Sequence, residues 1–163
     1  MSIKYRDFKS YVVEPVLADM GLGAEDRAAH LLMAIAAHES LGVKYLDQMD
    51  ARHRDGPAYG PFQFEKGGGF AEVHRLMEAD SRGGLDPARD VWEKYKVDDI
   101  RKLRQRLDSA VFYARVLLYP DRASIPASGN WDHLYAYYIR RWGPGKPPSL
   151  DEFLRAHANW KHG

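Results

Sequence analysis

The segment from Leu32 to Gln63 constrains the fold of this 163-residue chain more than any other. It includes nearly all of an apolar run, LLMAIAAHES at 31–40, that has the length and composition of a buried helix. On a helix that starts before this run, one face collects Ala28, Leu32, Ile35, Ala36 and Glu39. The pattern therefore predicts a core helix whose apolar stripe ends in a carboxylate.

Glu39 is the first candidate for chemistry because of its place at the end of that stripe. Burial disfavours the charged form of a carboxyl group and raises its pKa. A raised pKa is what a general acid needs at neutral pH. The alternative is that Glu39 lies one residue past the last buried turn, extends into water and has no chemical role.

The sequence after Ser40 is polar and rich in turn-forming residues. We expect irregular structure or a small β-hairpin here, leading into the segment from Gly60 to Phe64. Three aspartates in this interval are candidates for a second catalytic carboxylate: Asp47, Asp50 and Asp55. A solvated loop is the better interpretation of them, given the surface preference of Asp.

Two motifs in this region resemble those of the soluble lytic transglycosylases and goose-type lysozymes. These families place a Glu-Ser at a helix end, and then a segment of the form Ala-x-Gly-Leu-Met-Gln-Ile. Here HES at 38–40 is followed by AYGPFQF at 58–64. Three residues match the second motif, namely Ala58, Gly60 and Gln63, and three apolar residues replace its Leu, Met and Ile, namely Pro61, Phe62 and Phe64. The longer run GPAYGPFQFEKGGGF, with RRWGPGKP downstream, is similar to transglycosylase-like proteins of tailed bacteriophages.

The resemblance implies a peptidoglycan lytic transglycosylase that cleaves the β-1,4 bond between N-acetylmuramic acid and N-acetylglucosamine. Glu39 would act as acid and then as base, without a second carboxylate. Substrate contacts would come from the segment around Gly60, with Gln63 hydrogen-bonding sugar near the scissile bond. Further expected site residues are Ser40 and a tyrosine, which help to place the Glu39 carboxyl, and Tyr59 and Phe62, whose flat rings suit stacking on sugars.

The tyrosine is expected on a helix near the C-terminus, where these families carry Ala-Tyr-Asn-Ala-Gly. An aromatic stripe at helical spacing marks this helix, with Trp131, Leu134, Tyr135, Tyr138 and Trp142 on it. The Ala-Tyr match favours Tyr137 as the counterpart, whereas the spacing favours Tyr138. Both tyrosines remain candidates. The alternative is that the aromatic stripe packs in the core and has no role in a site.

The rest of the chain fits one mainly α-helical domain over residues 1–163, lysozyme-like with minimal β structure. The first helix carries an apolar face predicted from Phe8, Tyr11, Val12 and Val16. Apolar residues at three- and four-residue steps predict one continuous core helix over 100–117. Ser149 and Glu152 form a capping box for a last helix.

Composition and motif spacing exclude several functions. The net charge of +1 argues against a nucleic-acid partner, and the basic cluster at 101–106 is better explained as a solvated face. The sequence HES lacks the second histidine of a zinc HExxH motif, because position 42 is Gly42. The run EKGGG has its lysine before the glycines, unlike a phosphate-binding loop. We therefore predict no metal and no cofactor.

The N-terminus has scattered charges and no apolar core, so no secretory signal is expected. The longest apolar run, Leu31 to Ala37, is too short to span a membrane. We expect synthesis in a bacterial host cytoplasm and action on periplasmic peptidoglycan glycan strands, as an endolysin or a virion-associated enzyme. Two alternatives are a hydrolytic muramidase that uses Asp50 or Asp55, and a structural or adaptor protein that binds other phage virion or tail proteins.

Overall fold

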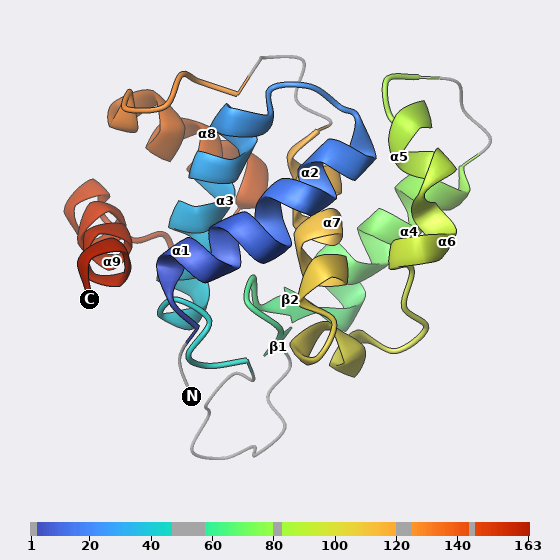
Figure 1. The fold of residues 1–163 in the computed structure, drawn as a ribbon, viewed down its shortest axis with the longest axis horizontal. Coiled ribbons are helices and arrows are strands. Elements are labelled where there is room, and N and C mark those ends of the chain that lie inside the picture. The colour runs from blue at the N-terminus through green and yellow to red at the C-terminus, as the bar shows by residue number, and fades with distance from the viewer. Residues whose placement is uncertain (1–2, 47–57, 80–82, 120–124, 144–145) are drawn as a thin grey trace.

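The computed structural model describes residues 3–46, 58–79, 83–119, 125–143 and 146–163 (Figure 1). Helices hold 69% of these residues and strands 3%, so the predicted mainly α fold with minimal β structure is confirmed. The elements are α1 (Tyr5–Phe8), η1 (Lys9–Val13), α2 (Glu14–Met20), α3 (Glu25–Ser40), β1 (Ala58–Tyr59), β2 (Phe64–Glu65), η2 (Lys66–Phe70), α4 (Ala71–Glu78), α5 (Asp86–Asp90), α6 (Trp92–Tyr95), η3 (Ile100–Arg104), α7 (Leu107–Leu118), α8 (Trp131–Trp142) and α9 (Leu150–His162).

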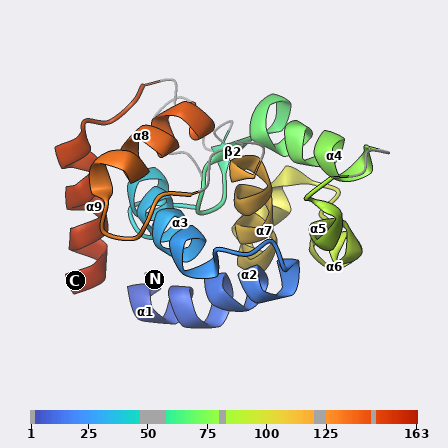
Figure 2. The ribbon, with the colours of Figure 1, turned by 90° about the horizontal axis from the view of Figure 1, so that it is seen from above.

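Helix α3 is the centre of the fold and is buried on almost every side. Seven consecutive residues from Leu31 to Ala37 are at most 1% exposed. The helix lies between α8 and α9 on one side and α2 and α7 on the other (Figures 1 and 2). A helix that is apolar on all its faces belongs in a core. The prediction that only one stripe of this helix faces the core was therefore too narrow.

The N-terminal segment forms one nearly continuous helical rod, with a π-helical turn between α1 and α2. Pro15 lies in the first turn of α2, directly after the π-helical turn, and its missing N–H interrupts the hydrogen bonds of the rod at this point. The predicted apolar face is only partly right, because Phe8 and Val16 are buried whereas Tyr11 is 79% exposed. Gly21 ends α2 in the left-handed conformation, with φ of 61°.

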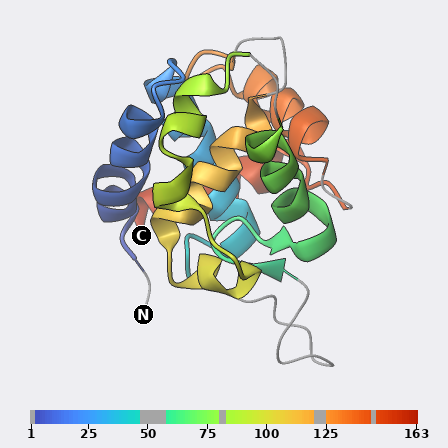
Figure 3. The same cartoon turned by 90° about the vertical axis from the view of Figure 1, so that its right-hand side faces the viewer.

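Among the described residues, the β structure is one short hairpin, in which β1 contacts η3 and β2 leads into η2 (Figure 3). Its two strands are antiparallel, and the register pairs Ala58 with Glu65 and Tyr59 with Phe64. This hairpin is formed by the motif segment itself, whereas residues 47–57, which make up most of the interval where a small hairpin was expected, lie outside the described residues. The chain then passes directly into η2 and α4.

The prediction of one continuous helix over 100–117 was wrong. The segment divides into the 3-10 helix η3 and the α-helix α7, and Arg106 between them has non-helical φ of −94° and ψ of 77°. The Arg106 guanidinium donates to Asp108 and to the carbonyl of Lys94, which fixes this break. Apolar periodicity cannot indicate such a break, because Leu103 before the break and Ala110 after it are both buried.

The C-terminal helices agree with their sequence patterns. The α8 stripe packs inward, with Leu134 and Tyr138 fully buried. Ser149 and Glu152 make both hydrogen bonds of the capping box at the start of α9. Among the described residues, no helix has the length and apolar character needed to cross a membrane.

Acidification is expected to weaken the packing of α9, because His157 is buried there in its neutral form. His157 is 5% exposed, 3.1 Å from the hydroxyl of Tyr5 and beside the ring of His30. Burial is the main cause that lowers the pKa of His157 from 6.5 to about 4, and His30 adds to it. A folded pKa below the unfolded value gives stability that is present above pH 6.5 and is lost as the pH falls toward about 4.

A His157→Phe variant should therefore lose less stability than the wild type over this range. Thermal unfolding followed by circular dichroism at intervals from pH 7 to pH 4 checks this. Superimposable pH dependences of the two proteins would show that His157 does not contribute.

Candidate functional site

The site is built around the C-terminal end of α3, which ends in a tight turn. Leu41, Gly42 and Val43 all have positive φ, at 50°, 73° and 62°. The Ser40 hydroxyl donates to the Ala36 carbonyl at 2.9 Å and accepts from the Val43 amide at 3.0 Å. These bonds fix the last turn of α3 and hence the direction of Glu39.

Trp160 of α9 closes this turn from outside. A Cβ added at Gly42 would lie 2.5 Å from the Trp160 ring, so only glycine fits there. The α3 end is thus held against α9 by packing.

The Glu39 carboxyl is partly buried and has one specific partner. The Tyr138 hydroxyl donates to Glu39 Oε1 at 2.8 Å. Burial raises the pKa of Glu39 above its usual value, and the bond from Tyr138 opposes this in part. The net effect keeps more of Glu39 protonated at neutral pH than an exposed glutamate would be.

The structure shows which of the two candidate tyrosines contacts Glu39. Tyr138 makes that contact, whereas the Tyr137 hydroxyl donates to the Leu118 carbonyl at 2.7 Å. Tyr137 is buried at 2% exposure against α7. Tyr138 is thus the candidate that bonds to Glu39, whereas Tyr137, at the neighbouring position on α8, faces a different part of the core.

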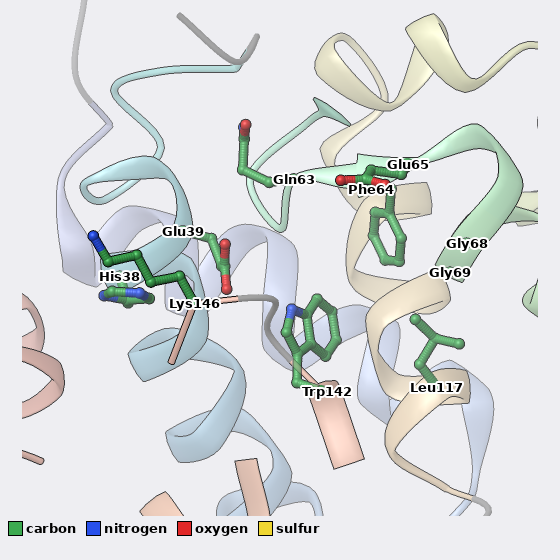
Figure 4. Close-up of a pocket in the computed structure, with 11 residues that line it drawn as sticks. His38, Glu39, Gln63, Phe64, Glu65, Gly68, Gly69, Leu117, Trp142 and Lys146 are labelled. Atoms are coloured by element: carbon green, nitrogen blue, oxygen red, sulfur yellow. The ribbon is translucent and has the colours of Figure 1, made fainter. Parts of the chain in front are cut away.

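Glu39 lies on one wall of a pocket of about 520 Å³ (Figure 4). The facing wall is formed by the hairpin and the start of η2, with Phe64, Glu65 and the pair Gly68 and Gly69. The complete lining is His38, Glu39, Gln63, Phe64, Glu65, Gly68, Gly69, Leu117, Trp142, Gly143 and Lys146. Two carboxylates, one lysine and one tryptophan therefore share a cavity that is open to solvent.

Gly69 keeps the facing wall close to α7. A Cβ at this position would lie 2.8 Å from Leu117 Cδ1 and 3.0 Å from Phe64 Cδ1. The absence of a side chain at Gly69 thus lets the backbone of η2 approach Leu117 and Phe64 closely.

Gln63 lines the pocket and also holds the hairpin turn together. Its backbone has φ of 51°, and its side-chain Nε2 donates to the Gly60 carbonyl at 2.8 Å and to the Tyr45 carbonyl at 3.3 Å. Gly60 itself has φ of 78°, and a Cβ there would meet the Leu103 carbonyl oxygen at 3.0 Å. Gly60 is therefore required for the turn that presents Gln63.

Three further predicted site residues do not lie in this pocket. Ser40 is 1% exposed and bonds only within the end of α3, so its effect on Glu39 is through the backbone. Phe62 is fully buried between Phe64 and Trp142, so its ring offers no face to a sugar. Tyr59 is not part of the lining of this pocket and lines a neighbouring cavity instead.

The aspartates proposed as second carboxylates, Asp47, Asp50 and Asp55, lie outside the described residues. The structure instead brings Glu65 to the pocket, a residue that the sequence analysis passed over. The period-two pattern of the strand could have indicated it, since Phe64 is buried and its neighbour must face outward.

Trp142 and Lys146 were also missed as site residues. Trp142 was read only as part of an aromatic core stripe, and Lys146 as part of a connector. Their convergence on Glu39 depends on how α8 ends against the hairpin, which no local pattern shows. Among the described residues, no three His, Cys, Asp or Glu side chains gather as metal ligands.

Tyr138→Phe is expected to move the alkaline limb of the activity profile to higher pH. The hydroxyl stabilises ionised Glu39, so its loss raises the pKa of Glu39 further and keeps the acid form at higher pH. We also expect a roughly tenfold loss of kcat, because the carboxyl loses its one positioning bond. The rate of a Glu39-dependent reaction between pH 4 and pH 9 tests this, and Tyr135→Phe on the same helix is the control. An unchanged limb would contradict the role of Tyr138.

Comparison with known proteins adds no family to this geometry. No protein-family model, no curated protein and no solved structure matches the chain. Function must therefore be argued from the pocket itself and from the two short motifs that form it.

Proposed function

We propose that this protein is a lytic transglycosylase that cleaves the β-1,4 bond between N-acetylmuramic acid and N-acetylglucosamine in peptidoglycan. The observation that carries this is the state of Glu39, a partly buried carboxyl of raised pKa on the wall of an open pocket, bonded by Tyr138. The resemblance of the HES and AYGPFQF segments to lytic transglycosylases supports the substrate class. The lysozyme-like character of the fold is part of the same proposal.

The reaction uses Glu39 twice. Protonated Glu39 donates its proton to the glycosidic oxygen as the bond from that oxygen to the muramic acid C1 breaks. The resulting carboxylate then accepts the proton of the muramic acid 6-hydroxyl, while the oxygen of that hydroxyl bonds to C1. The proton thus returns to Glu39, a 1,6-anhydro ring forms, and no water is consumed.

The surrounding residues fit these two steps. Tyr138 stabilises the carboxylate that exists between them, since it donates to Oε1. Trp142 offers an aromatic surface to a sugar in the pocket. With both Nε2 bonds of Gln63 made to backbone carbonyls, its Oε1 is the atom suited to accept from a sugar hydroxyl.

Mass spectrometry of the fragments released from purified peptidoglycan tests the proposal. The wild type is expected to release muropeptides with 1,6-anhydro ends, which are lighter by one water than hydrolysis products. Hydrated ends would exclude transglycosylation, and no release by a folded wild-type protein would exclude glycan cleavage.

A hydrolytic muramidase is the second candidate, and the position of Glu65 favours it. Glu65 faces the pocket from the wall opposite Glu39, where a second carboxylate could activate water. Under the leading proposal, Glu65→Gln keeps anhydro products and a rate within about threefold of wild type, because no second acid takes part. A loss of about a hundredfold or more, with hydrated wild-type products, would instead establish the hydrolytic route.

The adaptor alternative loses part of its basis. The basic cluster at 101–106 is a surface that an adaptor could use for assembly, but it is paired locally, with Arg101 bonded to Asp99, Lys102 to Asp98 and Arg106 to Asp108. Such paired charges also weaken a nucleic-acid role. Co-purification with assembled virions, without wall-clearing activity, would favour the hypothesis that the protein is an adaptor.

A further inference from the structure

A second cavity, of about 640 Å³, lies next to the Glu39 pocket. Its apolar surface comes from Tyr59, Phe70 and Ile100. Phe70 and Ile100 are 8% and 5% exposed, whereas Tyr59 is half-buried and presents more of its ring. Glu65 lines both cavities, so one ligand can extend from the first into the second.

The charges of this cavity differ in whether they are already paired. The Arg101 guanidinium is held by Asp99, with Nε 3.1 Å and 3.0 Å from the two carboxylate oxygens. These bonds lower the pKa of Asp99 to about 2. Lys66, in contrast, is exposed and has no ion pair with any described residue. Lys66 is thus the cation available to a ligand.

We propose that this second cavity binds the peptide stem of peptidoglycan, with Lys66 binding a stem carboxylate. The inference rests on the proposed function, because the stem branches from the muramic acid whose bond is cleaved at Glu39. Glu65, at the boundary, is placed to accept from the ammonium of the diamino acid in the stem. A continuation of the peptide-bearing glycan would carry no charge, because its lactyl carboxyl groups are in amide linkage to the stems, so it would not explain a mixed-charge wall next to an apolar floor.

Titration with the free stem tetrapeptide, L-Ala-γ-D-Glu-meso-diaminopimelate-D-Ala, tests binding without any need for catalysis. In ¹⁵N-labelled Glu39→Gln protein, saturable NMR shift changes are expected at the amides of Tyr59, Lys66 and Gly67. Lys66→Ala should weaken binding about three- to fivefold, as for a partly exposed ion pair. Lys161→Ala on α9 is the matched control and should leave binding unchanged.

A steric variant offers an independent test. A Cβ added at Gly67 meets no described atom within 4 Å, so Gly67→Phe can place a ring in the cavity without displacing the core. We expect it to reduce tetrapeptide binding at least tenfold. Gly83→Phe is the control, since Gly83 is also open among the described atoms but lines neither cavity.

Cleavage rates separate this inference from the proposed function. The wild type should cleave peptide-bearing strands with higher kcat/KM than strands stripped by an amidase, and Gly67→Phe should abolish that preference. Failure of the tetrapeptide to give saturable shifts would overturn the inference, as would shifts at the same amides by chitotetraose alone. If the wild type cleaves neither strand, the proposed function fails, and the titration still decides whether the cavity binds the stem.

Discussion

Glu39→Gln is expected to lower the rate of peptidoglycan cleavage by at least a thousandfold and to leave the fold intact. Glutamine keeps the shape of the side chain and a carbonyl oxygen that can accept from Tyr138, but it cannot donate a proton to the glycosidic oxygen. The same substitution also removes the base of the second step, so the loss should exceed that of a residue used once. Release of reducing or anhydro ends from purified peptidoglycan measures it.

The control is Glu72→Gln, which changes an exposed carboxylate on α4 that pairs with Arg75. This protein should cleave at the wild-type rate. A Glu39→Gln protein that retained a tenth or more of the wild-type rate would remove Glu39 from the catalytic role.

Glu39→Gln should raise the stability of the protein at neutral pH although it lowers the activity. The folded pKa of Glu39 is raised, so its contribution to stability is fully present below the unfolded pKa and is lost as the pH rises through the folded pKa. At neutral pH the wild type therefore bears the cost of a partly buried charge, which glutamine does not carry. Glu39→Gln should have a higher Tm than wild type at pH 7, with a smaller difference at pH 4.

The parts of the site that could be predicted from sequence are those set by neighbours along the chain. Helical spacing placed Glu39 at the end of a core helix, and the aromatic stripe on α8 brought Tyr138 to the same face as the buried Leu134. The capping box of α9 followed from Ser149 and Glu152 alone. Each of these features depends on a local period or a local hydrogen bond.

The parts that could not be predicted depend on packing between distant segments. Glu65 and Trp142 reach the pocket because the hairpin lies against the ends of α7 and α8. The break between η3 and α7 depends on the bonds that Arg106 makes, including one to the carbonyl of Lys94. Apolar spacing is the same on either side of such a break, so it carries no sign of it.

Phe62 shows most clearly how a motif residue can be misread, and its replacement has the second large expected effect. The motif resemblance implied an aromatic platform for sugars, but the ring is 0% exposed and lies 6.3 Å from Phe64 and 6.2 Å from Trp142 between ring centroids. Phe62→Ala would leave a cavity beneath the pocket wall. We expect a loss of about 3 to 5 kcal/mol in the free energy of unfolding, and a Tm lower by roughly 10 °C.

The two roles of Phe62 give different kinetic results, which makes the experiment decisive. A core residue, once removed, lowers stability and the fraction of folded enzyme, but KM at a temperature well below Tm changes little. A sugar platform would raise KM several-fold with little change in Tm. Urea unfolding and steady-state kinetics at low temperature measure both, with Tyr11→Ala as the matched control, since Tyr11 is 79% exposed and its loss should change stability by less than about 0.5 kcal/mol. The apolar positions of this motif then act by supporting the turn that presents Gln63, and the sugar contacts must come from residues that the pocket exposes, such as Trp142.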